Sequence, residues 1–262
     1  MNPQRNSLTF SDTYDESIVN TQIKEKINFL KTNGFVFDNI CEIKCTPHTW
    51  VFKYEGAILK SFLETEFDFL INDDTLVYLY INDIMYKNNK MVDFIGNEKV
   101  YYNPLSFRQT DDSIKNELYS ILSENVKSEK LYLIGGEMTF FAKLLKPKEF
   151  MMFTDFESIY EDAKINFPEN ENNIKLIKYN FSKLIKTDKN YTLIANTSRN
   201  GLDKNLCKEI LELELKKIVI ISCNKKSFIR DYNYIYNKYK ITQIFDLNTN
   251  YTVSVYFLEI IA

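Results

Sequence analysis

Glycine is scarce in this chain of 262 residues: it occurs six times, about 2% against a typical value of ~7%. This scarcity disfavours folds that depend on many glycine-rich turns or phosphate-binding loops. His48 is the single histidine, so a metal site with several histidine ligands is excluded and a Ser-His-Asp triad is disfavoured. No apolar run reaches the roughly 18 residues of a membrane-spanning helix, and we therefore predict no membrane partner.

Cysteine is also sparse, and its positions are Cys41, Cys45, Cys207 and Cys223. The first two form an isolated C-x3-C pair without further ligands close by, so we expect buried or incidental thiols and no metal site. The first residues lack the apolar segment of a secretory signal. These absences predict a protein of the cytoplasm or of another reducing intracellular compartment.

The composition is that of a globular protein, with 45% apolar and 26% charged residues. The net charge of −3 excludes nucleic-acid binding by bulk positive charge but leaves a local basic groove open. Basic residues such as Lys225, Lys226 and Arg230 follow Cys223. They fit contacts to phosphates and an ordinary solvated helix face about equally well.

The hydropathy pattern changes near residue 100. Residues 14–32 predict an amphipathic helix, because their apolar residues recur at helical spacing. Short apolar or alternating runs between residues 36 and 100 predict a small, mostly antiparallel sheet. We therefore expect residues 1–100 to form a small N-terminal α+β region.

Residues 101–262 are expected to form a second domain, in which strand-like and helix-like segments alternate. The predicted strands are Leu131–Ile134, Phe150–Thr154, Ile174–Tyr179, Tyr191–Ala195, Lys217–Ile221, Ile241–Leu247 and Thr252–Ile261. Repeated βα units indicate a mainly parallel sheet covered on both faces. The last two strands are joined by a short turn and predict a hairpin at the sheet edge.

Polar or glycine residues follow several of these strands, at the carboxyl ends where open α/β sheets bind ligands. They are the Gly135-Gly136 turn, Asp155, the stretch from Asn196 to Gly201, and Ser222-Cys223-Asn224. Cys223 lies between an apolar strand and a lysine-containing helix, which is the setting of an activated thiol nucleophile. A cysteine buried at the end of a core strand is the alternative, and the Gly-Gly turn also fits a plain tight turn.

Several segments carry recognisable motifs in a fixed order. They are Tyr102–Gln109 (YNPLSFRQ), Leu131–Phe140 (LYLIGGEMTF), Glu161–Asn166 (EDAKIN), Asn196–Asp203 (NTSRNGLD), Lys217–Asn224 (KIVIISCN) and then Arg230-Asp231. Together they resemble the RNA uracil-5-methyltransferases that depend on S-adenosylmethionine, with their P-x-x-F-x-Q, E-D-A-K-x-N, D-P-P-R-x-G-L-D and S-C-N segments. The resemblance implies a Rossmann-like class I methyltransferase domain with a mainly parallel sheet and a C-terminal β-hairpin.

The resemblance also implies a covalent mechanism on tRNA or rRNA. In that family a cysteine thiolate attacks C6 of uridine, C5 then takes the methyl group, and a glutamate removes the C5 proton. By position, Cys223 is the nucleophile, Asn196 replaces the acidic residue that contacts the base, and Arg199 supports its loop. The implied cofactor contacts come from Gln109, Gly135, Gly136, Asp155 and Asn180.

Departures from the family pattern concern the same site. Tyr132 replaces an aspartate of the first strand, and Met138 replaces a glycine of the cofactor loop, where we expect it to crowd S-adenosylmethionine and weaken its binding. Val253 stands where the family has the proton-abstracting glutamate. Two main hypotheses therefore remain: a divergent RNA uridine C5-methyltransferase, or a catalytically inactive relative that binds RNA or serves as a protein-interaction or structural subunit. A third is a methyltransferase that acts on a different substrate without the covalent route.

Overall fold

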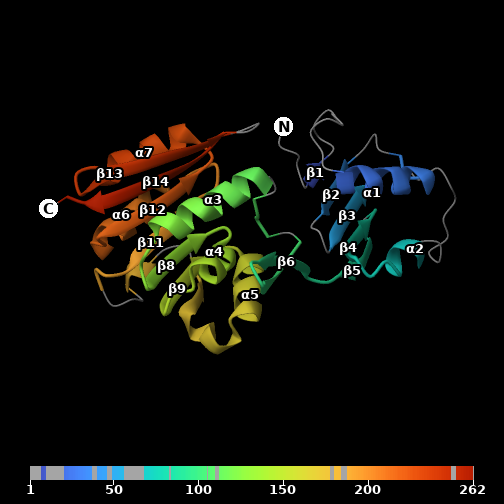
Figure 1. The fold of residues 1–262 in the computed structure, drawn as a ribbon, viewed down its shortest axis with the longest axis horizontal. Coiled ribbons are helices and arrows are strands. Elements are labelled where there is room, and N and C mark those ends of the chain that lie inside the picture. Colours follow the sequence, from blue (N-terminus) through green and yellow to red (C-terminus); the bar gives the residue numbers. More distant parts are fainter. Residues whose placement is uncertain are drawn as a thin grey trace. The chain divides into compact units, whose positions relative to one another are not determined.

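The structure is a computed structural model that describes residues 7–9, 21–36, 40–45, 49–55, 68–82, 84–104, 106–109, 112–177, 180–183, 188–248 and 252–261, and every structural statement below concerns these residues. The chain forms two compact units (Figure 1). The first comprises residues 1–105 with 110–112, and the second comprises residues 106–109 with 113–262. That the two units are separate functional domains stays a prediction.

The first unit holds a five-stranded sheet whose strands follow one another in sequence order. They are β1 (Ser7–Thr9), β2 (Ile40–Cys45), β3 (Trp50–Glu55), β4 (Leu76–Ile81) and β5 (Ile84–Asn88), with α2 (Asp68–Ile71) between β3 and β4 in the chain. Neighbouring strands are antiparallel except β3 and β4. A two-stranded antiparallel sheet of β6 (Met91–Ile95) and β7 (Glu98–Tyr102) completes the unit and confirms the expected, mostly antiparallel arrangement.

One amphipathic helix, α1 (Thr21–Thr32), packs its apolar face into the core of this sheet. The side chains that it buries are Ile23, Ile27 and Leu30. Gly34 follows with a left-handed φ of 91°, the conformation that commonly ends a helix. The predicted helix is confirmed over α1, whereas residues 14–20 lie outside the described residues.

The second unit is a doubly wound α/β layer structure with the strand order β10-β9-β8-β11-β12-β14-β13. The strands are β8 (Lys130–Gly135), β9 (Glu149–Thr154), β10 (Ile174–Leu176), β11 (Thr192–Asn196), β12 (Lys217–Ser222), β13 (Tyr239–Asn248) and β14 (Thr252–Ile260). The helices are α3 (Asp112–Asn125), α4 (Met138–Leu145), α5 (Glu157–Asn166), α6 (Asp203–Leu213) and α7 (Lys225–Ile235), with short 3-10 helices η3 (Pro168–Asn173) and η4 (Phe181–Lys183). Strands β8 to β12 pair in parallel, and β13 and β14 form an antiparallel hairpin at the edge, as predicted.

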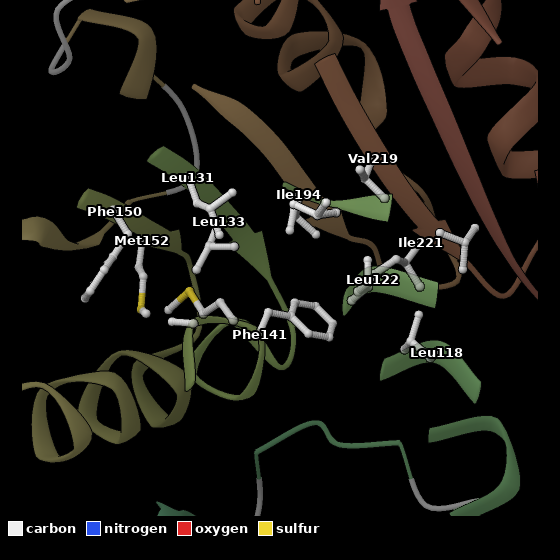
Figure 2. Close-up of a cluster of buried hydrophobic side chains, with 14 of the residues drawn as sticks. Leu118, Leu122, Leu131, Leu133, Phe141, Phe150, Met152, Ile194, Val219 and Ile221 are labelled. Carbon is white, nitrogen blue, oxygen red and sulfur yellow. The ribbon is translucent and has the colours of Figure 1, made fainter. Parts of the chain in front are cut away.

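Both faces of this sheet are covered, because successive strand residues point to opposite sides. Leu131 and Leu133 of β8 lie in the core formed with α3, α4 and α5 (Figure 2). Tyr132, between them, packs in the core formed with α6 and α7 and stacks on Tyr191. No helix in the described part of the chain is long and apolar enough to cross a membrane.

The apolar pattern misplaced some element boundaries. The helical pattern of the sequence predicts a helix from Phe228 to Lys238, but α7 begins at Lys225. The side chain of Asn224 caps its first turn, and the exposed lysines there carry no apolar signal. The predicted strand Ile174–Tyr179 is too long, since β10 ends at Leu176.

Candidate active site

The carboxyl ends of β8, β11 and β12 lie level with one another. Asn196, the last residue of β11, is in register with Gly135 of β8 and with Ile221 of β12. Backbone hydrogen bonds continue past the strand ends, from Gly136 N to the Asn196 carbonyl at 3.2 Å and from Thr197 N to the Ile221 carbonyl at 3.0 Å. The loops that the sequence singled out after these strands therefore start at one edge of the sheet.

Cys223 directly follows β12 at this edge, and its side chain is exposed. The alternative of a cysteine buried at a strand end is therefore wrong for Cys223, although Cys45 and Cys207 are buried. Asn196 is in register with Ile221, and Cys223 follows two residues later along the neighbouring strand's continuation. Among the described residues, no group of three or more His, Cys, Asp or Glu could hold a metal ion.

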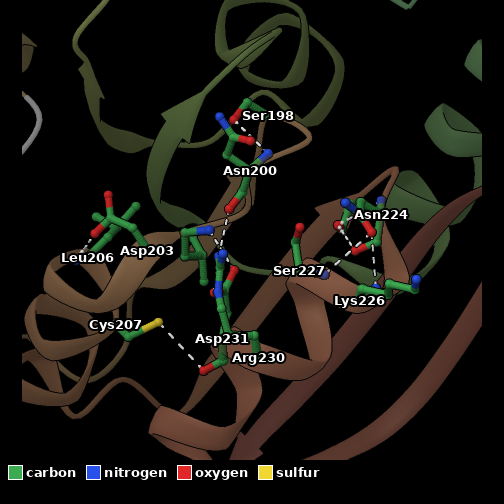
Figure 3. A network of polar contacts seen from close by, with 12 residues as sticks. Ser198, Asn200, Asp203, Leu206, Cys207, Asn224, Lys226, Ser227, Arg230 and Asp231 are labelled. Atoms are coloured by element: carbon green, nitrogen blue, oxygen red, sulfur yellow. Dashed lines mark hydrogen bonds and ion pairs between the residues drawn. The ribbon is translucent and has the colours of Figure 1, made fainter.

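Helix α7 holds the loop that follows β11 (Figure 3). The carbonyl of Arg199 accepts hydrogen bonds from Asn224 Nδ2 at 3.1 Å and from Ser227 Oγ at 2.7 Å. The guanidinium of Arg230 donates to the Asn200 carbonyl at 2.6 Å. The loop is thus fixed through backbone atoms, and Arg199 takes part through its carbonyl while its side chain is exposed.

A buried carboxylate anchors the far end of the same loop. Asp231 is 1% exposed, and its Oδ2 accepts from Leu202 N at 2.7 Å while its Oδ1 pairs with Arg230. Gly201 passes directly over it with φ +77°, and a Cβ atom there would collide with the carboxylate. The predicted R-x-G-L-D and R-D segments therefore meet in space, because the glycine leaves room for the aspartate.

The structure adds a residue that sequence reasoning missed, Glu137, which lies in the turn between β8 and α4. Its carboxylate is 3% exposed and accepts from the backbone N of Gln109 at 3.0 Å and from Asn196 Nδ2 at 3.2 Å. Two residues that the sequence had assigned separately to the cofactor and to the base thus meet at one carboxylate. A charge inside the otherwise apolar segment LIGGEMTFF was the signal that could have pointed to it.

Burial raises the pKa of Glu137 above its usual value, and this outweighs the opposing effects of the Gln109 hydrogen bond and of the positive charges of Arg108 and Lys115. The native state therefore holds a proton on Glu137 at pH values where the unfolded chain has released it. Above the ordinary glutamate pKa of about 4.3, this carboxyl makes folding stability fall as pH rises towards its native pKa.

Replacing Glu137 by glutamine removes this titration while keeping an acceptor for Gln109 N. We expect the melting temperature of Glu137→Gln relative to the wild type to be higher at pH 8 than at pH 5, with no such trend below about pH 4. Thermal unfolding followed by circular dichroism across this pH range measures the difference. A difference that shrinks as pH rises would contradict a raised pKa.

One expectation about the cofactor loop needs correction. Met138 does not crowd the loop: its side chain is fully buried in the core with Leu133 and Met152, because α4 begins at this residue and turns it under the sheet. The Gly135-Gly136 turn is packed closely against its neighbours within the protein, and its contact with the cofactor stays a prediction. A Cβ atom on Gly135 would collide with the Asn196 carbonyl, and one on Gly136 would lie 2.6 Å from the ring of Phe107.

The remaining predicted residues lie farther along the same edge. Asp155 directly follows β9 and is exposed. Asn180 lies beyond the end of β10, with a left-handed φ of 65°, and its backbone N donates to Glu209 of α6 at 2.8 Å. Val253, at the position of the expected proton acceptor, is an apolar core residue.

Comparisons with known proteins agree with the fold. No protein-family model matches the chain. It is 30% identical over 144 residues, 52% of its length, to an uncharacterized RNA methyltransferase of Mycoplasma mobile, of which it covers 39%. It is 27% identical over 160 residues, 56% of its length, to an uncharacterized RNA methyltransferase of Clostridium tetani, of which it covers 35%. The chain thus spans well under half the length of these relatives.

A solved structure extends the likeness to most of the chain. The tRNA (uracil-54, C5)-methyltransferase of Pyrococcus abyssi, determined in complex with S-adenosyl-L-homocysteine, matches with a TM-score of 0.70 at 18% identity. The match covers 97% of this chain and 76% of that one. The expected Rossmann-like methyltransferase fold is therefore confirmed.

Proposed function

We propose that this chain, a divergent relative of the RNA methyltransferases, transfers a methyl group from S-adenosylmethionine to C5 of a uridine in RNA. The observation that carries the proposal is the exposed thiol of Cys223 at the carboxyl edge, beside the end of β11. A thiolate in this place can bond to C6 of a pyrimidine and so make C5 nucleophilic. Once C5 carries the methyl group, the C5 proton passes to a base. The electron pair of the C5–H bond then re-forms the C5–C6 double bond, and the sulfur of Cys223 leaves as a thiolate.

Residues at the same edge fit the cofactor. Asp155 offers an exposed carboxylate for ribose hydroxyls, and Phe156 beside it presents an exposed ring. The hydroxyl of Thr139, buried at the start of α4, has no hydrogen-bond partner among the described residues. When bound, S-adenosylmethionine supplies the activated methyl group, and these residues would bind and orient it.

An RNA substrate suits the charges beside the thiol. Lys225 and Lys226 follow Cys223 at the start of α7, and both are exposed. They can contact phosphates even though the net charge of the chain is −3. The inactive alternative rested partly on Met138, whose burial removes that ground. It now depends on the apolar Val253 and on Tyr132 and Asn196, which replace acidic residues of the family pattern. We therefore favour the active enzyme.

Trapping of a covalent complex tests the proposal. Incubation with S-adenosylmethionine and RNA that contains 5-fluorouridine should yield a protein–RNA adduct that survives denaturation, because fluorine at C5 cannot leave as a proton. The adduct is read as a shifted band on a denaturing gel and as a mass increase. The same RNA with ordinary uridine is the control and should give product without a stable adduct. RNA binding without any adduct would favour the inactive alternative.

A further inference from the structure

The contact between Glu137 and Asn196 fixes which way the asparagine amide faces. Asn196 Nδ2 donates to Glu137 Oε2 at 3.2 Å, and both side chains are buried. Glu137 is itself held from its other oxygen by the backbone N of Gln109 at 3.0 Å. When ionised, the Glu137 carboxylate accepts hydrogen bonds and has none to give, so above the raised pKa of Glu137 the amide must turn its NH2 group towards it.

This orientation leaves the carbonyl oxygen of Asn196 for another partner. In the described part of the chain, the side-chain hydrogen bond of Asn196 uses Nδ2, which leaves Oδ1 open to another partner. A flipped amide would set Oδ1 against the carboxylate of Glu137, oxygen against oxygen, while Gln109 N keeps that carboxylate in place. Asn196 therefore presents an acceptor that cannot easily become a donor.

The position of this acceptor relative to Cys223 decides what it can contact. Asn196 and Ile221 are paired in register, and Cys223 lies two residues beyond Ile221 at the same edge. In a pyrimidine held by sulfur at C6, the ring atom on the opposite side is N3. Uracil carries a proton on N3, whereas cytosine has a lone pair there, so an acceptor facing N3 bonds to the first and repels the second.

We propose that Glu137 is a positioning residue that locks the Asn196 amide so that the site accepts uracil and rejects cytosine. The inference rests on the proposed covalent function, because attachment at Cys223 is what fixes the register of the ring. Asn196 stands where the family pattern has an acidic residue, and Glu137 supplies a carboxylate next to that position.

The test compares two RNAs that differ in one base. Both carry the same sequence, with 5-fluorouridine or 5-fluorocytidine at one position, and the rate of adduct formation is measured with each. The wild type should favour the 5-fluorouridine RNA by about 50-fold or more. In Glu137→Gln the ratio should fall at least about tenfold, because the new amide can donate to Asn196 Oδ1 and release the lock. Glu169→Gln, the same change on the exposed η3, should keep the wild-type ratio.

A double variant separates this role from a general loss of structure. In Glu137→Gln with Asn196→Asp, the amide and the carboxylate exchange places, so the amide at position 137 can donate to a carboxylate at position 196. The free oxygen of that carboxylate can then accept only, and the preference for 5-fluorouridine should return. Thermal unfolding of each variant reports whether it folds, and a merely structural role would not produce this rescue.

The outcomes of these experiments distinguish failure of the proposed function from failure of the inference. Failure of the wild type to form an adduct with either RNA overturns the proposed function. Equal rates with both RNAs, or a ratio that Glu137→Gln leaves unchanged, overturns the inference while the function stands.

Discussion

Replacement of Cys223 by alanine is expected to lower methyl transfer to RNA by roughly 10⁴-fold or more, and to abolish the adduct with 5-fluorouridine RNA. Without the sulfur–C6 bond, C5 of uracil stays a poor nucleophile, and the other described thiols, Cys45 and Cys207, are buried. Transfer of a labelled methyl group to RNA measures the loss. Since the side chain is exposed, the free energy of unfolding should change by no more than about 0.5 kcal/mol.

Cys207→Ala is the matched control, because this thiol is buried in the core between α6 and α7. Burial raises the pKa of Cys207 to about 12, so it is held as an unreactive thiol. We expect Cys207→Ala to retain the adduct and most of the activity, with a modest loss of stability. An adduct that persists in Cys223→Ala and disappears in Cys207→Ala would show that Cys207, and not Cys223, is the nucleophile.

Gly135→Ala should have the largest effect on stability, a loss of about 3 kcal/mol or more. Two costs combine: Gly135 has φ +89°, which an L side chain rarely adopts, and its Cβ atom would collide with the backbone carbonyl of Asn196. The Cβ atom would collide with a backbone atom, which cannot rotate away as a side chain could. The collision therefore disappears only if β8 and β11 move apart at their carboxyl ends. Chemical denaturation measures the change.

Gly96→Ala isolates the backbone part of this effect. Gly96 also has a left-handed φ, of +58°, but nothing lies within 4 Å of a Cβ atom built there. It should cost about 1 kcal/mol, the conformational part alone. Equal losses for the two variants would mean that the close approach of Gly135 to Asn196 contributes little.

The order of elements in the second unit was predictable because each strand and helix carries its own periodic signal. Alternation of apolar runs and amphipathic segments predicts a parallel sheet with helices on both faces, and the short turn before Thr252 predicts the final hairpin. Boundaries were less predictable. The start of α7 depends on the cap that Asn224 provides, and a cap is a local hydrogen bond that an apolar pattern does not record.

The site was predictable as a set of strand ends but not as a set of contacts. Met138 illustrates the difference: its residue type suggested a blocked loop, whereas the structure turns its side chain into the core. Arg199 acts through its carbonyl, which every residue possesses. Side-chain direction follows from the packing of whole elements, and no single position in the sequence specifies it.

The sequence by itself determined that this is an α/β protein with a cysteine at a strand end and with motifs that resemble those of RNA methyltransferases, because these features are local. Only the tertiary structure decided which of them meet. Glu137 and Asn196 are 59 residues apart in the chain, yet their side chains share a hydrogen bond. Parallel strands bring their carboxyl ends to one edge whatever their separation in sequence. A glutamate without a motif thereby becomes the partner of Asn196, the residue that we propose faces the substrate.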